Sequence, residues 1–162
     1  TDDRTGALYN PVNDTWTPIS TIGAPNTGQY VTGVWTGTEV LLFGGGNPVH
    51  ARYNPTTNTW GALPQSGLPF FNPSSVWLNG RMYVWGMAVS NGGATQTSAL
   101  GAFDVATDQW INLSQAGAPI ARFETAMTVI DGRIMIFGGN NGFGNTFGDG
   151  ALYDPATNTW AP

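Results

Sequence analysis

The sequence feature that most constrains the fold is a short segment that occurs four times. Each copy starts with an aromatic residue and ends with Trp seven positions later, and the copies begin at Tyr9, Tyr53, Phe103 and Tyr153, with offsets of 44, 50 and 50 residues. The second and sixth positions are always Asn or Asp, and Pro follows the second position in three copies. Such side chains hydrogen-bond the backbone of a turn, and Pro presets φ, so each copy predicts two strands joined by a tight turn.

A second motif lies between these copies. It is an apolar run, rich in β-branched and aromatic residues, that ends in Gly, and it occurs at Val40–Gly45, Met82–Gly86 and Ile134–Gly139. A run of this kind without helical spacing predicts a buried strand that ends at a bulge or a close backbone approach. Turn signals come just before each run, at Thr36-Gly37, Asn79-Gly80 and Asp131-Gly132, of which the last two favour a type I′ hairpin. Strand-like residues precede these turns, so each period predicts four antiparallel strands.

A four-stranded sheet that recurs every 45 to 50 residues cannot bury both faces alone, which favours sheets stacked around an axis as a β-propeller. The glycines after the second strand and the Tyr-Asp-Pro-x-Thr-x-x-Trp pattern at residues 153–160 resemble kelch repeats, in the version common in bacterial proteins. The resemblance extends over roughly residues 6–161 and implies an all-β, kelch-type propeller. Kelch repeats often carry Arg and His near the first strand; Arg122 matches that Arg, whereas Glu124 stands near the His position, and the second unit has only Gly86-Met87 in place of a glycine pair.

The number of blades is unusual. The pattern predicts a single kelch-repeat segment over residues 1–162, with complete four-stranded blades at about 25–60, 69–110 and 119–160 and an outer half-blade at 6–16. Propellers close with about four to eight blades, so we expect the ring to be incomplete in one chain. Two interpretations follow: further blades come from a longer native chain, or a second copy assembles with the first as a homo-oligomer. An open aromatic blade face needs a covering surface in either case.

Composition excludes several partners. The chain carries a net charge of −5 with five Arg and no Lys, which argues against nucleic acid or an anionic membrane as the ligand. No apolar run is long enough for membrane insertion, and the first residues lack the basic and apolar regions of a signal peptide, so we expect any export signal to have been removed. Few charges with abundant Thr, Asn and Gly are typical of a secreted or cell-surface protein of bacterial type.

The two rims of such a propeller differ. One carries the near-identical tight turns. The other carries irregular loops between the second and third strands, at 46–50, 88–98 and 140–149, together with the segments between blades, at 17–28, 61–73 and 111–123. Unequal loops on a rigid scaffold usually carry binding groups. We therefore predict an extracellular binding or interaction module that uses this rim, with a glycan or a protein as ligand.

Candidate ligand-binding residues on this rim do not follow the repeat: His50, Arg52, Phe70, Phe71, Arg122, Glu124, Phe143 and Phe147. Arg122 and Glu124 stand two apart at the entry to an innermost strand, so we expect both side chains to face the central channel. There the Arg fork could hold a carboxylate or sugar hydroxyls; a structural ion pair is the alternative. The Phe residues could stack on a sugar or a peptide, or be buried against another blade. The four repeat Trp residues are predicted to pack between blades.

Catalysis finds little support in the residue types. One His, no Cys and no Lys leave no Cys-His pair, Schiff-base lysine or multi-His metal site, so we predict no catalytic residue, no metal site and no cofactor. Two alternatives to a binding module remain. Kelch-type sialic-acid mutarotases imply that a propeller enzyme acting on a small sugar could work with Arg122 and Glu124. The third interpretation is a purely architectural protein in a surface assembly.

Overall fold

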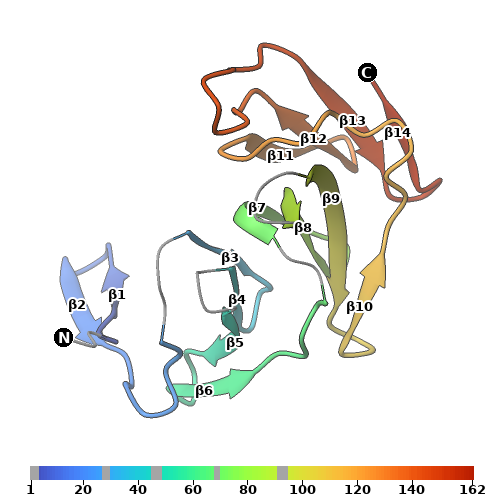
Figure 1. The fold of residues 1–162 in the computed structure, drawn as a ribbon. Helices are drawn as coiled ribbons and strands as arrows, with labels where there is room; N and C mark the ends of the chain where they lie inside the picture. Colours follow the sequence, from blue (N-terminus) through green and yellow to red (C-terminus); the bar gives the residue numbers. More distant parts are fainter. Residues whose placement is uncertain (1–3, 27–29, 45–48, 68–69, 91–94) are drawn as a thin grey trace.

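The computed structural model describes residues 4–26, 30–44, 49–67, 70–90 and 95–162, and these form fourteen strands with no helix (Figure 1). Strands β1 (Ala7–Asn10) and β2 (Thr15–Pro18) make a two-stranded half-blade. Three four-stranded antiparallel sheets follow, which we call blades 1 to 3. Blade 1 consists of β3 (Val31–Trp35), β4 (Val40–Gly44), β5 (Val49–Asn54) and β6 (Thr59–Ala62), and blade 2 of β7 (Phe70–Leu78), β8 (Arg81–Ser90), β9 (Thr95–Asp104) and β10 (Gln109–Asn112). Blade 3 consists of β11 (Ala126–Ile130), β12 (Arg133–Phe137), β13 (Gly150–Asp154) and β14 (Thr159–Ala161).

The innermost strands of successive blades lie side by side. Thr32 Oγ1 on β3 is 2.7 Å from Ser75 Oγ on β7, and the Ser74 hydroxyl donates to the carbonyl of Thr125, just before β11, at 3.0 Å. The sheets therefore turn around a shared axis, and the units follow one another in an arc from the half-blade to blade 3 (Figure 1). The predicted kelch-type propeller with an open ring is confirmed.

The turns form as the repeat predicts. The Oδ1 atom at the second repeat position accepts a backbone N–H from two residues later, at 2.8 to 3.0 Å, in all four copies: Asn10, Asn54, Asp104 and Asp154. The two predicted type I′ pairs have positive φ at both residues, 49° and 79° for Asn79-Gly80 and 49° and 74° for Asp131-Gly132. Local turn chemistry thus sets the strand register in each blade.

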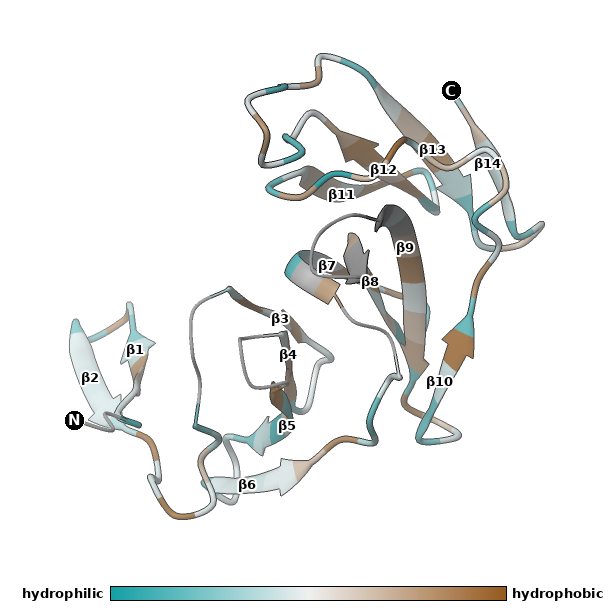
Figure 2. Cartoon of the chain, viewed as in Figure 1, coloured by the Kyte–Doolittle hydropathy of each residue, from teal (hydrophilic) through white to brown (hydrophobic). Residues whose placement is uncertain are grey.

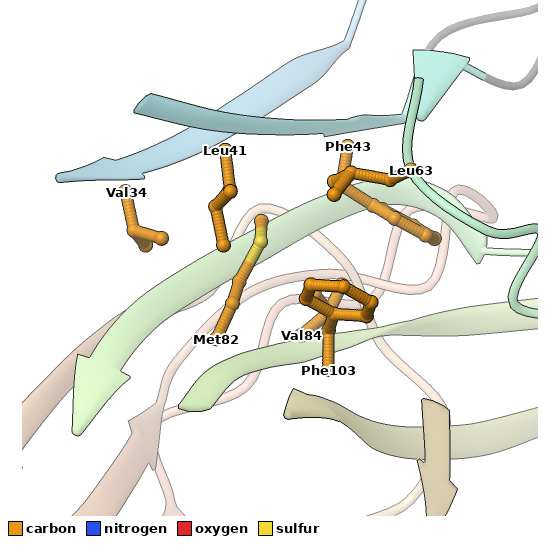
Figure 3. Packing of buried hydrophobic residues seen from close by; sticks show 7 residues of the cluster. All are labelled: Val34, Leu41, Phe43, Leu63, Met82, Val84 and Phe103. Atoms are coloured by element: carbon orange, nitrogen blue, oxygen red, sulfur yellow. The ribbon is translucent and has the colours of Figure 1, made fainter. Parts of the chain in front are cut away.

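The hydrophobic core lies between blades. In the first seam, Val34, Leu41, Phe43 and Leu63 pack against side chains of blade 2, namely Met82, Val84 and Phe103 (Figure 3). The second seam joins blade 2 to blade 3 through Tyr83, Trp85, Leu100 and Ala102 on one side and Ile134, Ile136 and Tyr153 on the other. Hydrophobic residues accordingly concentrate on strands such as β9 and β12, whereas β2 and β6 are more polar (Figure 2).

One loop differs from the expectation. In blade 3, β12 ends at Phe137 because Gly138 and Gly139 take φ values of 69° and 93°. Blade 2 has only one glycine at this place, and its ladder continues from Gly86 paired with Ala99 to Ser90 paired with Thr95. The loop predicted at 88–98 is therefore strand at both ends, and its residues 91–94 lie outside the described residues, as do 46–48 of the first loop. Within the described chain, no helix is long and apolar enough to cross a membrane.

Candidate functional site

An unusual backbone conformation recurs where the innermost strands begin. Tyr30, Asn72 and Glu124 occupy the same register in their blades, five residues before the positions that pair with Val40, Met82 and Ile134. All three are left-handed, with φ of 66°, 45° and 56°. Among the described non-glycine residues with positive φ, only Tyr30 and Glu124 are neither Asn nor Asp. Left-handed backbone costs such residues roughly 1–2 kcal/mol, and strain of this kind concentrates at functional sites. We call the region around Tyr30, Asn72 and Glu124, where the innermost strands begin, the channel mouth, and it is the candidate site.

Glu124 is exposed and is held by two amide side chains. Asn72 Nδ2 donates to Oε1 at 3.1 Å, and Asn140 Nδ2 donates to Oε2 at 2.6 Å. The donors come from the neighbouring inner strand and from the loop at 140–149, so two segments besides its own fix this carboxylate. Because both donors are neutral amides, these two hydrogen bonds orient the carboxylate without pairing it with a cation.

Arg122 does not share this position. Its side chain is fully buried, with 0 % of its surface exposed. Nε donates to the Ile120 carbonyl at 3.0 Å, and Nη1 donates to the carbonyls of Gly138 and Asp149, both at 3.2 Å, and to Asp149 Oδ1 at 2.8 Å. The guanidinium also lies over the Phe147 ring, 4.1 Å from its centroid. Arg122 therefore ties together the two ends of the loop between β12 and β13.

The expectation that Arg122 and Glu124 face the channel together is wrong in this structure. Side chains two apart share a face only in an extended segment, and the left-handed φ of 56° at Glu124 breaks that alternation. The structural alternative holds for Arg122, with Asp149 as its ion-pair partner at 2.8 Å.

The loop at 140–149 is folded by its own polar groups. Asn140 Oδ1 accepts the Gly142 N–H at 2.9 Å, Asn141 Oδ1 accepts the Phe143 N–H at 3.0 Å, and the Phe147 N–H donates to the Gly139 carbonyl at 2.9 Å. Phe143 is left 71 % exposed on this folded loop. It therefore offers an aromatic face to solvent on the same loop that positions Glu124.

The remaining predicted residues lie elsewhere. His50 packs edge-on against Phe43, with ring centroids 4.6 Å apart, and its Nε2 is 3.3 Å from Ser66 Oγ. Phe70 contacts the same Phe43 ring at 5.2 Å between centroids. Both side chains thus contribute to the seam between blades 1 and 2. The side chain of Phe71 lies outside the described residues.

Arg52 lies in the same seam. It pairs with Asp108 of blade 2 and with Glu39 of its own blade, the latter at 3.6 Å, and its guanidinium lies 5.8 Å from the Phe103 ring centroid. These contacts make Arg52 a bridge between blades rather than part of the channel mouth.

The ion pair at Arg122 predicts a pH effect on stability. The hydrogen bond from Arg122 lowers the pKa of the Asp149 carboxyl below its ordinary value of 3.8. A pKa that is lowered in the folded state stabilises the fold at pH values above the ordinary pKa. This stability is lost as pH falls from about 4 through the lowered pKa. Asp149→Asn is expected to remove this part of the acid dependence in urea unfolding measured between pH 2 and 6. Asp131→Asn, in a tight turn on the opposite rim, is the control, and an equal effect of both substitutions would contradict the assignment.

Tyr30, Asn72, Asn140 and Asp149 are site residues that the sequence reasoning missed. The signal for the first two was present, because aligning the three units on their apolar runs places Tyr30 and Asn72 at the position of Glu124. The two loop residues carry no such signal, since only the folded loop brings them to Glu124 and Arg122. No group of three or more His, Asp or Glu that could hold a metal occurs in the described part of the chain.

Comparison with known proteins places this geometry in a family. The family model described as the KLHDC2/KLHL20/DRC7 Kelch-repeats domain matches residues 5–162. The chain is 31 % identical over 157 residues to the Caenorhabditis elegans protein tag-53, with 83 % of this chain and 11 % of that protein covered. It is 25 % identical over 135 residues to beta-scruin of Limulus polyphemus, covering 75 % and 14 %. An F-box/kelch-repeat protein of Arabidopsis thaliana is 44 % identical over 62 residues, covering 37 % and 17 %.

The chain spans less than a fifth of the length of these relatives. None of these three comes from a bacterium, so the likeness to the bacterial version of the repeat stays a prediction. Kelch-repeat domains generally mediate interactions between proteins. The family match over nearly the whole chain, together with the three four-stranded blades, shows that this protein belongs to the kelch-repeat family.

Proposed function

We propose that this domain binds a protein partner at the channel mouth, and that Glu124 receives a basic side chain of that partner. One observation carries the proposal: Glu124 is held in a left-handed backbone conformation, at the position shared by all three blades, with each carboxylate oxygen bound by an amide from a different segment. A group that is costly to place and fully oriented is suited to recognition, because its binding geometry exists before the partner arrives.

Charge supports a basic partner. The Arg122 cation at this rim is already paired with Asp149, whereas Glu124 is held by neutral amides. The chain as a whole carries a net charge of −5, so its field attracts cationic ligands. Phe143 and Tyr30, 71 % and 47 % exposed, add aromatic faces on which a guanidinium or a lysine stem can stack.

The cell surface or the extracellular space is the proposed location. Its support is the composition, with five Arg, no Lys and abundant Thr, Asn and Gly. An antibody raised against the domain tests this by fractionation of intact cells of the source organism. Signal in the medium or on unpermeabilised cells is the expected result, and signal only after lysis would contradict it.

The binding prediction is tested with a displayed library of random short peptides, selected on the wild-type domain. Selected peptides are expected to be enriched in Arg or Lys and to bind Glu124→Gln about tenfold more weakly, the loss expected for one charge-assisted hydrogen bond of about 1.4 kcal/mol. Asp131→Asn is the matched control, because it removes the same charge at a turn on the other rim and leaves an Asn-Gly pair like Asn79-Gly80.

Three results would contradict the proposal. Peptides without basic residues that bind Glu124→Gln as well as wild type would remove Glu124 from the site. A neutral glycan bound on an array, with loss of binding in Glu124→Gln, would replace the protein ligand by a sugar. Faster interconversion of free sugar anomers than in buffer, followed by NMR, would favour the enzyme alternative.

A further inference from the structure

One hydrogen bond recurs at the outer edge of the seams between units. The indole N–H of Trp60 donates to the Ser20 carbonyl at 2.7 Å, that of Trp110 to Pro64 at 2.8 Å, and that of Trp160 to Ser114 at 2.9 Å. Each acceptor stands four residues after the repeat Trp of the preceding unit. Each Trp thus binds the connector by which the chain leaves the previous unit.

A second bond fixes the same connector residue. The N–H of Ser20 donates to Asn58 Oδ1 at 2.7 Å, and the N–H of Ser114 donates to Asn158 Oδ1 at 2.9 Å. Each of these Asn residues also accepts a hydroxyl from the first residue of its repeat, Tyr53 or Tyr153. Tyr, Asn and Trp of one repeat therefore form a receptor that binds both the N–H and the C=O of one connector residue.

In the remaining seam, between blades 1 and 2, both the connector residue and the receptor residues differ. Its connector residue is Pro64, which has no N–H to donate. In that repeat the sixth position is Asp108 rather than Asn, and Asp108 accepts a hydrogen bond from Arg52 of the preceding blade instead. The first position is Phe103, which has no hydroxyl. The receptor residues thus change together with the connector that they bind.

The connectors share a sequence. Residues 20–25 and 114–119 both read Ser-x-x-Gly-Ala-Pro, and residues 64–69 read Pro-x-x-Gly-Leu-Pro. The glycines have φ of 75°, 67° and 86° in chain order. A Cβ added at Gly117 would lie 3.3 Å from the Cβ of Trp160, and one at Gly23 would lie 3.6 Å from that of Trp60. The turn lies against the Trp side chain and requires a left-handed backbone, so glycine suits this position because it adopts a positive φ readily.

The half-blade carries an equivalent receptor, with Asp14 at the position of the Asn. The Tyr9 hydroxyl donates to Asp14 Oδ1 at 2.9 Å, and the Tyr9 and Trp16 rings lie 4.8 Å apart, the same separation as Tyr53 and Trp60. Trp16 is nevertheless 67 % exposed, because no connector covers it within the described residues. We propose that Tyr9, Asp14 and Trp16 bind the connector of a further kelch blade, a segment of the type Ser-x-x-Gly-Ala-Pro.

A second copy of the described chain does not supply this segment. Its three connectors are already bound by Trp60, Trp110 and Trp160 of the same chain. The occupant is therefore a fourth connector, different from those that leave the half-blade, blade 1 and blade 2. A carboxylate at position 14 accepts the connector N–H more strongly than the amide of Asn58 or Asn158 does, because the bond is charge-assisted.

The test joins the sequence Ser-Gln-Ala-Gly-Ala-Pro, a copy of residues 114–119, to the N-terminus of the chain through a flexible Gly/Ser linker, which gives an effective concentration in the millimolar range. The readout is the indole N–H resonance of Trp16, assigned with Trp16→Phe, together with acrylamide quenching of its fluorescence. We expect the Trp16 resonance to shift and quenching to fall, while the Trp160 resonance stays in place. Gly→Ala in the added segment is expected to weaken binding about tenfold, because the left-handed turn disfavours Ala.

Two outcomes would overturn the inference. The first is a Trp16 signal that the added segment does not change, or that the Ala version changes equally. The second is a Trp16 signal in the unmodified chain that becomes protected as protein concentration rises, together with a dimer mass in sedimentation, because a second copy would then cover the half-blade.

Discussion

Trp160→Ala is expected to lower the free energy of unfolding by about 3–5 kcal/mol, the usual cost of removing a well-packed large aromatic residue. The Trp160 ring lies 5.5 Å from that of Trp85 and 5.2 Å from that of Tyr153, and its N–H donates across the seam to Ser114. The same substitution at Trp16 is expected to cost about 1 kcal/mol or less, because Trp16 is largely exposed and, in the described part of the chain, its ring packs on that of Tyr9.

Urea unfolding followed by far-UV circular dichroism measures both variants, which carry the same chemical change at equivalent repeat positions. Comparing the two variants therefore separates the effect of removing a repeat Trp from the effect of removing its contacts in a seam. Equal losses of stability in the two variants would mean that the second seam does not depend on Trp160 and would contradict the role of the repeat Trp at the seams, on which the further inference rests.

The features that the sequence predicts well are those set within a few residues. Turn bonds from Asn10, Asn54, Asp104 and Asp154 need only the backbone two positions on, so the repeat alone locates them. The period then predicts stacked sheets, because a four-stranded unit leaves both faces to be covered. Fold class and the packing of the three later repeat Trp residues follow from these two arguments.

Other features depend on backbone conformation that residue types do not reveal. The pairing of Arg122 with Glu124 assumed an extended segment, and the left-handed φ at Glu124 removes that basis. The roles of His50 and Arg52 depend on which neighbouring blade they meet, which no spacing within one unit indicates. The segments between blades lie on the rim that the sequence predicts to be irregular, yet they share one glycine turn, because the Trp of the next unit binds a carbonyl of the connector each time.

Arg122→Ala is expected to lower the free energy of unfolding by about 3–5 kcal/mol, the usual cost of truncating a large, fully buried side chain. The substitution leaves the carbonyls of Ile120 and Gly138 without their donor and opens a cavity beside Phe147. Arg122→Lys is expected to recover only part of the loss, because a single ammonium in place of Nη1 leaves the Ile120 carbonyl without its Nε donor. Arg133→Ala, in the hairpin on the opposite rim, is the control for loss of one positive charge.

The same variant separates a positioning role for Arg122 from direct contact with the ligand. Since the loop at 140–149 supplies Asn140 to Glu124, its loosening is expected to weaken peptide binding although the guanidinium is fully buried. Arg122→Ala should therefore lose stability and binding together, and Glu124→Gln should lose binding with little change in the urea midpoint. An Arg122→Ala variant as stable as wild type that no longer binds would contradict the positioning role, because it would mean that the guanidinium itself meets the ligand, as the sequence alone suggests.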